Sequence, residues 1–238
     1  GIAYNMLSKQ NGFVTNFQMA MNPQIIKNYA SGERDRMYKL VFRGAKFSYL
    51  LLLTLSMPVI IEAPFILDLW LKEVPEYTVI FLQIAIFTAI LNTLSNPLIV
   101  TMHATGKVRD YQLVVGGLSL LTLPFVYIAL KNGAEPQHAM IIAFVVEFIC
   151  HLARLYMLKR SISFPILRFL SNVTLRVFAI TILAMIIPVI IHYYIVSEIP
   201  RFLLVSIISM ISTLSIGYML GFNKEERAMI KEKVIRII

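Results

Sequence analysis

The sequence predicts an all-α polytopic membrane protein with about seven transmembrane helices. Hydrophobic residues make up 58% of the 238 positions and charged residues 15%, whereas soluble domains contain roughly half and about a quarter. Several long segments carry no charged residue, and the basic residues are concentrated in every second loop. This composition excludes intrinsic disorder, and the single cysteine, Cys150, excludes a disulfide scaffold.

Six predicted spans follow from the lengths of the apolar segments. A helix needs about 20 mostly apolar residues to cross a bilayer. Residues 137–158 form one such segment, which is apolar apart from Glu147, His151 and Arg154. The other five contain no Asp, Glu, Lys or Arg and comprise residues 47–61, 77–102, 111–130, 177–197 and 202–222.

Residues 10–26 form the seventh predicted span, although they are rich in amides. They contain no charged residue, but Asn and Gln occupy six positions. Buried amides without hydrogen-bond partners cost free energy in hydrocarbon. We therefore expect this helix to avoid lipid contact on at least one side.

The distribution of Lys and Arg predicts the orientation of the spans, because cytoplasmic loops carry the excess of these residues. One set of alternate loops, together with the C-terminal tail, holds eighteen of them, and the other set holds three. The C-terminus is thus predicted to be cytoplasmic, and the N-terminal end of this chain to lie outside. The net charge of +9 is a topology signal and does not indicate a nucleic-acid partner.

Three segments complete the predicted organisation. The chain opens with Gly1 and lacks a signal-peptide pattern, so we interpret it as the C-terminal part of a longer transporter. Residues 62–75 include the single Trp and predict a short interfacial helix. Residues 223–238 predict a basic amphipathic helix on the inner membrane surface, with Asn223 as its N-cap.

Two polar helix faces are candidates for a substrate cavity. In the first predicted helix, five polar residues are separated by 3, 4, 3 and 4 positions, which places their side chains on a single helix face. In the predicted span at residues 77–102, a second set of polar side chains points in nearly the same direction from the helix axis. Such faces line a cavity or form hydrogen bonds between helices, and we favour the cavity for the first helix. The first set is Ser8, Asn11, Thr15, Gln18 and Asn22, and the second is Thr88, Asn92, Ser95 and Asn96.

Charged residues form two further candidate sites. Arg36, Lys39, Arg43 and Lys46 are spaced as one basic stripe leading into a span. Such a stripe either binds anionic headgroups or a pyrophosphate, or is an ordinary positive-inside anchor, which we favour.

Glu147, His151 and Arg154 recur at i, i+4 and i+7 within a predicted span. An ionisable residue at this depth indicates function by default. Glu147 is thus a candidate for proton coupling, with His151 or Arg154 as its partner. A structural ion pair is the alternative. The four histidines lack the spacing of a metal site, and no catalytic residue or cofactor is predicted.

Four segments resemble proteins of the multidrug/oligosaccharidyl-lipid/polysaccharide exporter superfamily. The first resembles the polar loop after the second helix of a lobe in that superfamily, and the other three resemble the C-terminal half of Wzx-type O-antigen and capsule flippases. The similarity extends over essentially the whole chain. The segments are residues 22–35 (NPQIIKNYASGERD), 69–71 (LWL), 104–107 (ATGK) and 220–227 (LGFNKEER).

This resemblance implies a two-lobe exporter of the bacterial inner membrane. Residues 1–160 would form the second lobe, residues 161–222 two trailing helices and residues 223–238 the cytoplasmic tail. The implied activity is translocation of an undecaprenyl-pyrophosphate-linked oligosaccharide by alternating access, with membrane lipids and a polysaccharide polymerase or ligase as partners. A cation-coupled multidrug exporter and a scaffold or enzyme of glycan assembly are the alternatives.

Overall fold

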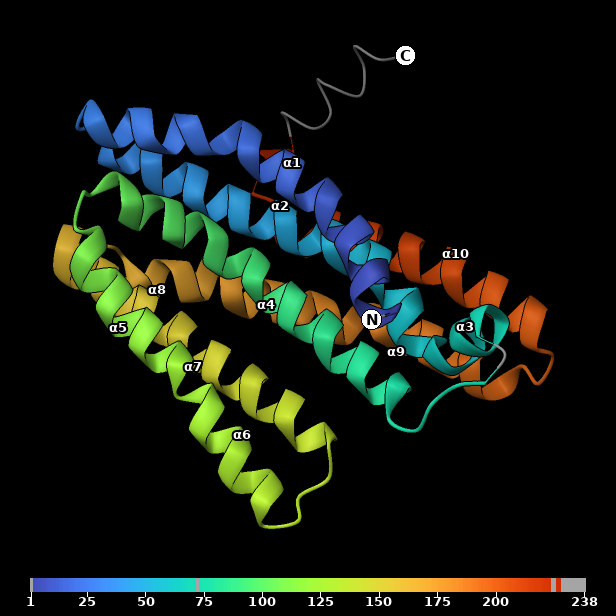
Figure 1. The fold of residues 1–238 in the computed structure, drawn as a ribbon. Coiled ribbons are helices and arrows are strands. Elements are labelled where there is room, and N and C mark those ends of the chain that lie inside the picture. Colours follow the sequence, from blue (N-terminus) through green and yellow to red (C-terminus); the bar gives the residue numbers. More distant parts are fainter. Residues whose placement is uncertain (1, 72, 224–225, 228–238) are drawn as a thin grey trace.

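The computed structural model describes residues 2–71, 73–223 and 226–227. These residues form helices and no strand, which confirms the all-α prediction. The helices run up and down in one bundle (Figure 1). The loops that are richest in Lys and Arg, between α1 and α2, α4 and α5, and α7 and α8, lie at the same end of it.

Three long helices form the centre of the bundle. They are α1 (Ile2–Ala30), α2 (Arg34–Ile61) and α4 (Thr78–Ala104), and each packs against the other two. Gly32 joins α1 to α2 with a φ of 77°, a conformation that a residue with a Cβ rarely adopts. Buried apolar residues fill the space between these helices, among them Met37, Leu52, Leu82 and Leu98.

Six helical segments are long and apolar enough to cross a membrane, so the chain is a multi-pass membrane protein. They correspond to the six apolar segments predicted from the sequence. The seventh predicted span corresponds to α1, which is 29 residues long but is not among these six. Its amides account for the difference, and α2 and α4 cover it on two sides.

One apolar segment is broken in the middle. It comprises α5 (Val108–Leu120) and α6 (Thr122–Lys131), and both pack against α7 (Gln137–Ile162). Pro124 explains the break, because it has no N–H to donate to Leu120 and its ring clashes with that carbonyl. Pro58, Pro97 and Pro188 instead lie inside continuous helices.

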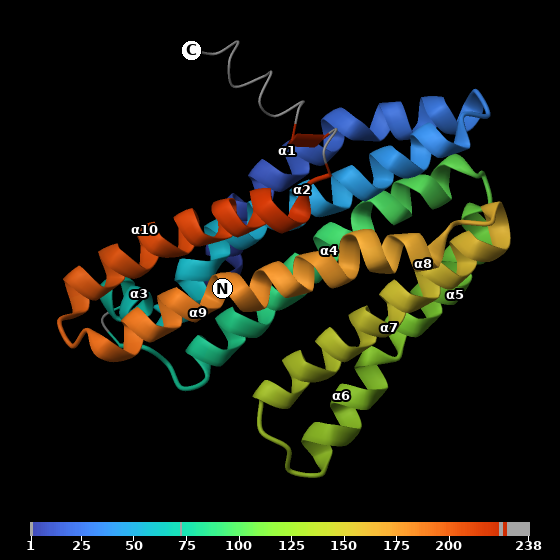
Figure 2. The ribbon, with the colours of Figure 1, turned by 180° about the vertical axis from the view of Figure 1, so that it is seen from behind.

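The last two spans pack against α2 (Figure 2). α8 (Ile166–Phe169) and η1 (Leu170–Thr174) lead into α9 (Leu175–Tyr194), and α10 (Glu198–Ile216) continues into η2 (Gly217–Gly221). α9 and α10 contact each other and α2.

Two shorter segments were also predicted. The predicted interfacial segment contains α3 (Ala63–Trp70), in which Leu69 and Trp70 are exposed. Of the predicted C-terminal helix, residues 224–225 and 228–238 lie outside the described residues. The described part supports Asn223 as the N-cap, because its carbonyl accepts a hydrogen bond from Arg227 N–H and its own N–H donates to the Glu226 carboxylate.

Candidate functional site

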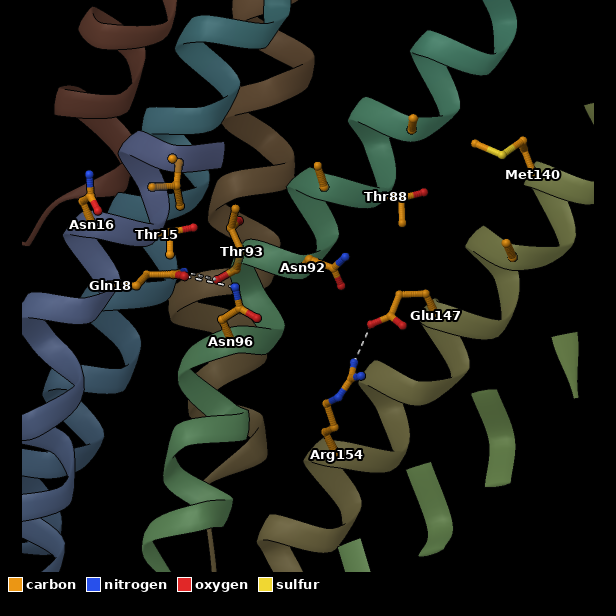
Figure 3. Close-up of a pocket in the computed structure, with 15 residues that line it drawn as sticks. Thr15, Asn16, Gln18, Thr88, Asn92, Thr93, Asn96, Met140, Glu147 and Arg154 are labelled. Atoms are coloured by element: carbon orange, nitrogen blue, oxygen red, sulfur yellow. Dashed lines mark hydrogen bonds and ion pairs between the residues drawn. The ribbon is translucent and has the colours of Figure 1, made fainter. Parts of the chain in front are cut away.

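A cavity of about 840 Å³ lies between α1, α4 and α7 (Figure 3). Its walls carry hydroxyl and amide groups from α1 and α4, and an acid and a base from α7. The polar lining residues are Thr15, Asn16, Gln18, Thr88, Asn92, Thr93, Asn96, Glu147 and Arg154. Small residues of the three helices, such as Gly12, Ala89 and Ala143, leave room for the cavity.

The structure brings most of the predicted polar residues to this one cavity. Thr15 and Gln18 approach it from α1, and Thr88, Asn92 and Asn96 from α4. In Figure 3, Thr88 and Asn92 point into the space between α4 and α7. Asn22 is half-buried and lies outside the lining, and the side chain of Asn11 is outside the described residues. Asn16 and Thr93 line the cavity as well, although they lie off the two predicted faces.

Gln18 also connects two helices, as in the alternative that the spacing left open. Its side chain is buried, its Nε2 donates to the carbonyl of Thr93 at 3.3 Å, and its Oε1 accepts from Asn96 Nδ2 at 3.0 Å. Figure 3 shows the amide reaching from α1 to α4. Both ends of the Gln18 amide have protein partners, and the Thr88 hydroxyl donates to the carbonyl of Ile84 at 2.9 Å. Asn92 therefore offers the freer polar group to a ligand.

Glu147 and Arg154 form an ion pair beside the cavity. Arg154 Nη1 lies 2.7 Å from Glu147 Oε1 and 3.3 Å from Ser95 Oγ, and Arg154 Nε donates to Tyr111 Oη at 3.2 Å. Arg154 thereby connects α7 to α4 and α5. The Glu147 side chain stays 22% exposed and points from α7 toward α4 (Figure 3).

His151 contacts the same hydroxyl as Arg154, that of Ser95, but does not pair with Glu147. It is buried, does not line the cavity, and shares a hydrogen bond of 2.8 Å between its Nδ1 and Ser95 Oγ. The partner of Glu147 is therefore Arg154. A helix turns by 400° over four residues, which places His151 about 40° from Glu147, toward the packed side of α7.

The predicted basic stripe divides in the structure. Arg36 is exposed and pairs with Glu33 at 2.7 Å. Lys39, Arg43 and Lys46 line a second cavity of about 340 Å³. Lys46 departs from the expected surface position, because it is 1% exposed.

The C-terminal segment neutralises the buried end of this stripe. Lys46 Nζ lies 2.7 Å from Glu226 Oε2 and donates to the carbonyl of Gly221 at 3.1 Å. Arg43 Nε lies 3.4 Å from Glu226 Oε1. A buried ammonium needs such a counterion. Lys39, which is exposed and forms no ion pair among the described residues, therefore remains the member of the stripe that can attract an anion at the second cavity.

A further ionic cluster was not predicted from the sequence. Glu62 is fully buried at the junction of α2 and α3, with its Oε1 2.8 Å from His192 Nδ1 and its Oε2 3.2 Å from Arg201 Nε. The only sequence signal is an acidic residue directly after an apolar span, a position that is normally exposed to solvent. This cluster joins α9 and α10 to the C-terminal end of α2.

Apolar helices around a polar, partly charged cavity are the architecture of a membrane transport protein. The MatE family model matches residues 1–128, from α1 into α6. This match covers more than half of the chain, and the chain belongs to the MatE family of membrane exporters, within the multidrug/oligosaccharidyl-lipid/polysaccharide exporter superfamily. Members of this family are transporters and not enzymes. No curated protein and no solved structure matches the chain.

Proposed function

We propose that this exporter translocates an undecaprenyl-pyrophosphate-linked oligosaccharide between the leaflets of the bacterial inner membrane. The observation that supports this substrate is the lining of the 840 Å³ cavity. It offers several amide and hydroxyl groups, among them Asn92, Asn96 and Thr88, and one carboxylate. Amides suit sugar hydroxyls because an amide both donates and accepts hydrogen bonds.

The charge of the cavity favours a neutral ligand portion. Glu147 is the one acidic residue among the described lining residues, and Arg154 already neutralises it at 2.7 Å. A site for cationic drugs requires an uncompensated negative charge. The lining therefore fits an uncharged glycan better than a cation.

The pyrophosphate would be attracted by the basic groups at the second cavity. Lys39 and Arg43 line it together with Asn172 and Asn223. Arg supplies planar donors that match phosphate oxygens, and Lys supplies a point charge. In this proposal residues 1–160 act as one lobe, the basic end of the bundle faces the cytoplasm, and a polysaccharide polymerase or ligase receives the flipped unit.

The first test measures which leaflet holds the lipid-linked oligosaccharide in cells with and without the full-length gene. An impermeant probe of outward-facing sugars reports the outer leaflet. Deletion should leave the oligosaccharide on the inner leaflet. An unchanged distribution would refute the proposed flipping activity.

Asn92→Leu should then lower glycan export roughly tenfold, which corresponds to about 1.4 kcal/mol of lost hydrogen bonding to the sugar. Asn22→Leu is the matched control, because Asn22 lies outside the lining. Export should remain near normal in this control at equal protein level. If the two variants behave alike, the cavity does not bind the glycan.

A cation-coupled multidrug exporter is the second candidate function, and the partial exposure of Glu147 to the cavity favours it. Under this candidate, Glu147→Gln should abolish the dependence of drug export on external pH, because an amide cannot exchange a proton. Glu135→Gln, at an exposed position in the α6–α7 connection, is the control. If export by the Glu147→Gln variant still depends on pH, Glu147 does not have the coupling role.

A further inference from the structure

A third cavity, of about 570 Å³, lies between the end of α4, the start of α5 and the end of α7. Its volume is within the range of small-molecule pockets, about 300 to 1,000 Å³. It is separate from the α1–α4–α7 cavity and shares no lining residue with it. All three helix ends lie at the basic end of the bundle (Figure 1).

The cavity is polar on one side and apolar on the other. Its polar groups are Lys107, Asp110 and Arg160, all exposed, and Ser161. None of the three charged residues forms an ion pair within the part of the chain that the structure describes. The hydroxyl oxygen of Ser161 is buried and has no hydrogen-bond partner among the described residues. These groups are therefore available to a ligand.

The apolar side continues onto the outer surface of the bundle. Leu113 and Val114 of α5 line the cavity and are 66% and 44% exposed, and Tyr156 of α7 is 64% exposed. On a membrane-spanning helix, such residues face acyl chains. A ligand in this cavity thus has its polar part at the end of the spans and its apolar part along α5, which is the geometry of a membrane phospholipid.

We propose that this cavity binds the headgroup of an aminophospholipid, such as phosphatidylethanolamine. Lys107 and Arg160 bind the phosphate, and the Ser161 hydroxyl donates to one of its oxygens. Asp110 faces the primary ammonium. Two cations and one carboxylate match a zwitterionic headgroup better than that of phosphatidylglycerol, because only the zwitterionic headgroup places a positive ammonium beside the carboxylate, whereas phosphatidylglycerol places a neutral glycerol there.

The proposal is tested on the purified full-length protein in detergent, with native mass spectrometry as the readout. The protein is titrated with equimolar phosphatidylethanolamine and phosphatidylglycerol, and we expect preferential retention of the former. The double variant Lys107→Gln/Arg160→Gln should bind it roughly 30-fold more weakly, from about 1 kcal/mol per lost charge. Lys159→Gln, at a neighbouring exposed position outside the lining, should bind like the wild type.

Asp110→Asn tests the choice of headgroup. The preference for phosphatidylethanolamine over phosphatidylglycerol should fall about fivefold in this variant, because one charge contact is lost. Unchanged retention in the double variant, or an unchanged preference in Asp110→Asn, would overturn the assignment. Displacement of the lipid by millimolar inorganic phosphate would show that the groups bind free phosphate instead. These results are independent of whether the protein exports glycans or drugs.

Discussion

Replacing Lys46 by Met should lower the free energy of unfolding by about 3–5 kcal/mol, one of the largest effects expected of a single substitution in this protein. The Lys46 ammonium is buried and its closest counterion is Glu226, at 2.7 Å. Met fills a similar volume but leaves the buried Glu226 carboxylate with Arg43, at 3.4 Å, as its remaining ionic partner among the described residues. Thermal unfolding of the purified protein in detergent measures the change.

Two comparison variants separate the ion pair from a general effect of removing charge. Lys39→Met changes the same residue type on the same helix at an exposed position that forms no ion pair with any described residue, and its effect should stay within about 0.5 kcal/mol. The double variant Lys46→Met/Glu226→Gln should recover most of the lost stability, because neither charge remains buried. Equal losses in Lys46→Met and Lys39→Met would contradict the interpretation.

The second large effect is expected at Glu62. Glu62→Gln should destabilise the packing of α9 and α10 on α2 by about 3 kcal/mol, because Arg201 loses its buried counterion and His192 loses a carboxylate at 2.8 Å. Hydrogen exchange at residues 195–201, between the two helices, should become faster while exchange in α4 stays unchanged.

Glu198→Gln provides the control for this second prediction. Glu198 is exposed in the first turn of α10 and forms no ion pair among the described residues. Its substitution should leave exchange at residues 195–201 close to that of the wild type. Similar rates in Glu62→Gln and Glu198→Gln would mean that the buried cluster does not hold the two helices in place.

The spans could be predicted from the sequence because hydrophobic length is a local property. Six apolar segments correspond to helices that satisfy the same criterion in the structure. The break at Leu121 could not be predicted from the sequence, because Pro124 lies inside an apolar segment and a proline in a membrane helix leads to either a kink or a break. Pro97, by contrast, sits within an unbroken α4.

For the candidate site, the sequence could predict only which polar side chains share a face of the same helix. A period of 3.6 residues placed Thr15 with Gln18 and Thr88 with Asn92, and these residues line the cavity. The spacing within one helix does not specify which helix it faces. The contacts of Lys46 with Glu226 and of Glu62 with His192 join residues 180 and 130 positions apart, and only the packed structure reveals them.

The break in the α5–α6 segment affects the α7 wall of the 840 Å³ cavity, because α5 and α6 both pack against α7. α6 has no buried residue, whereas α5 buries Tyr111 and Val115. The half of α7 that contributes Met140 and Ala143 to the cavity thus packs against a helix without a buried residue. Arg154 fixes the other half of α7 to α4 and α5. We therefore expect a displacement of the half of α7 that contains Met140 to change the cavity wall near Met140 more than the wall near Arg154.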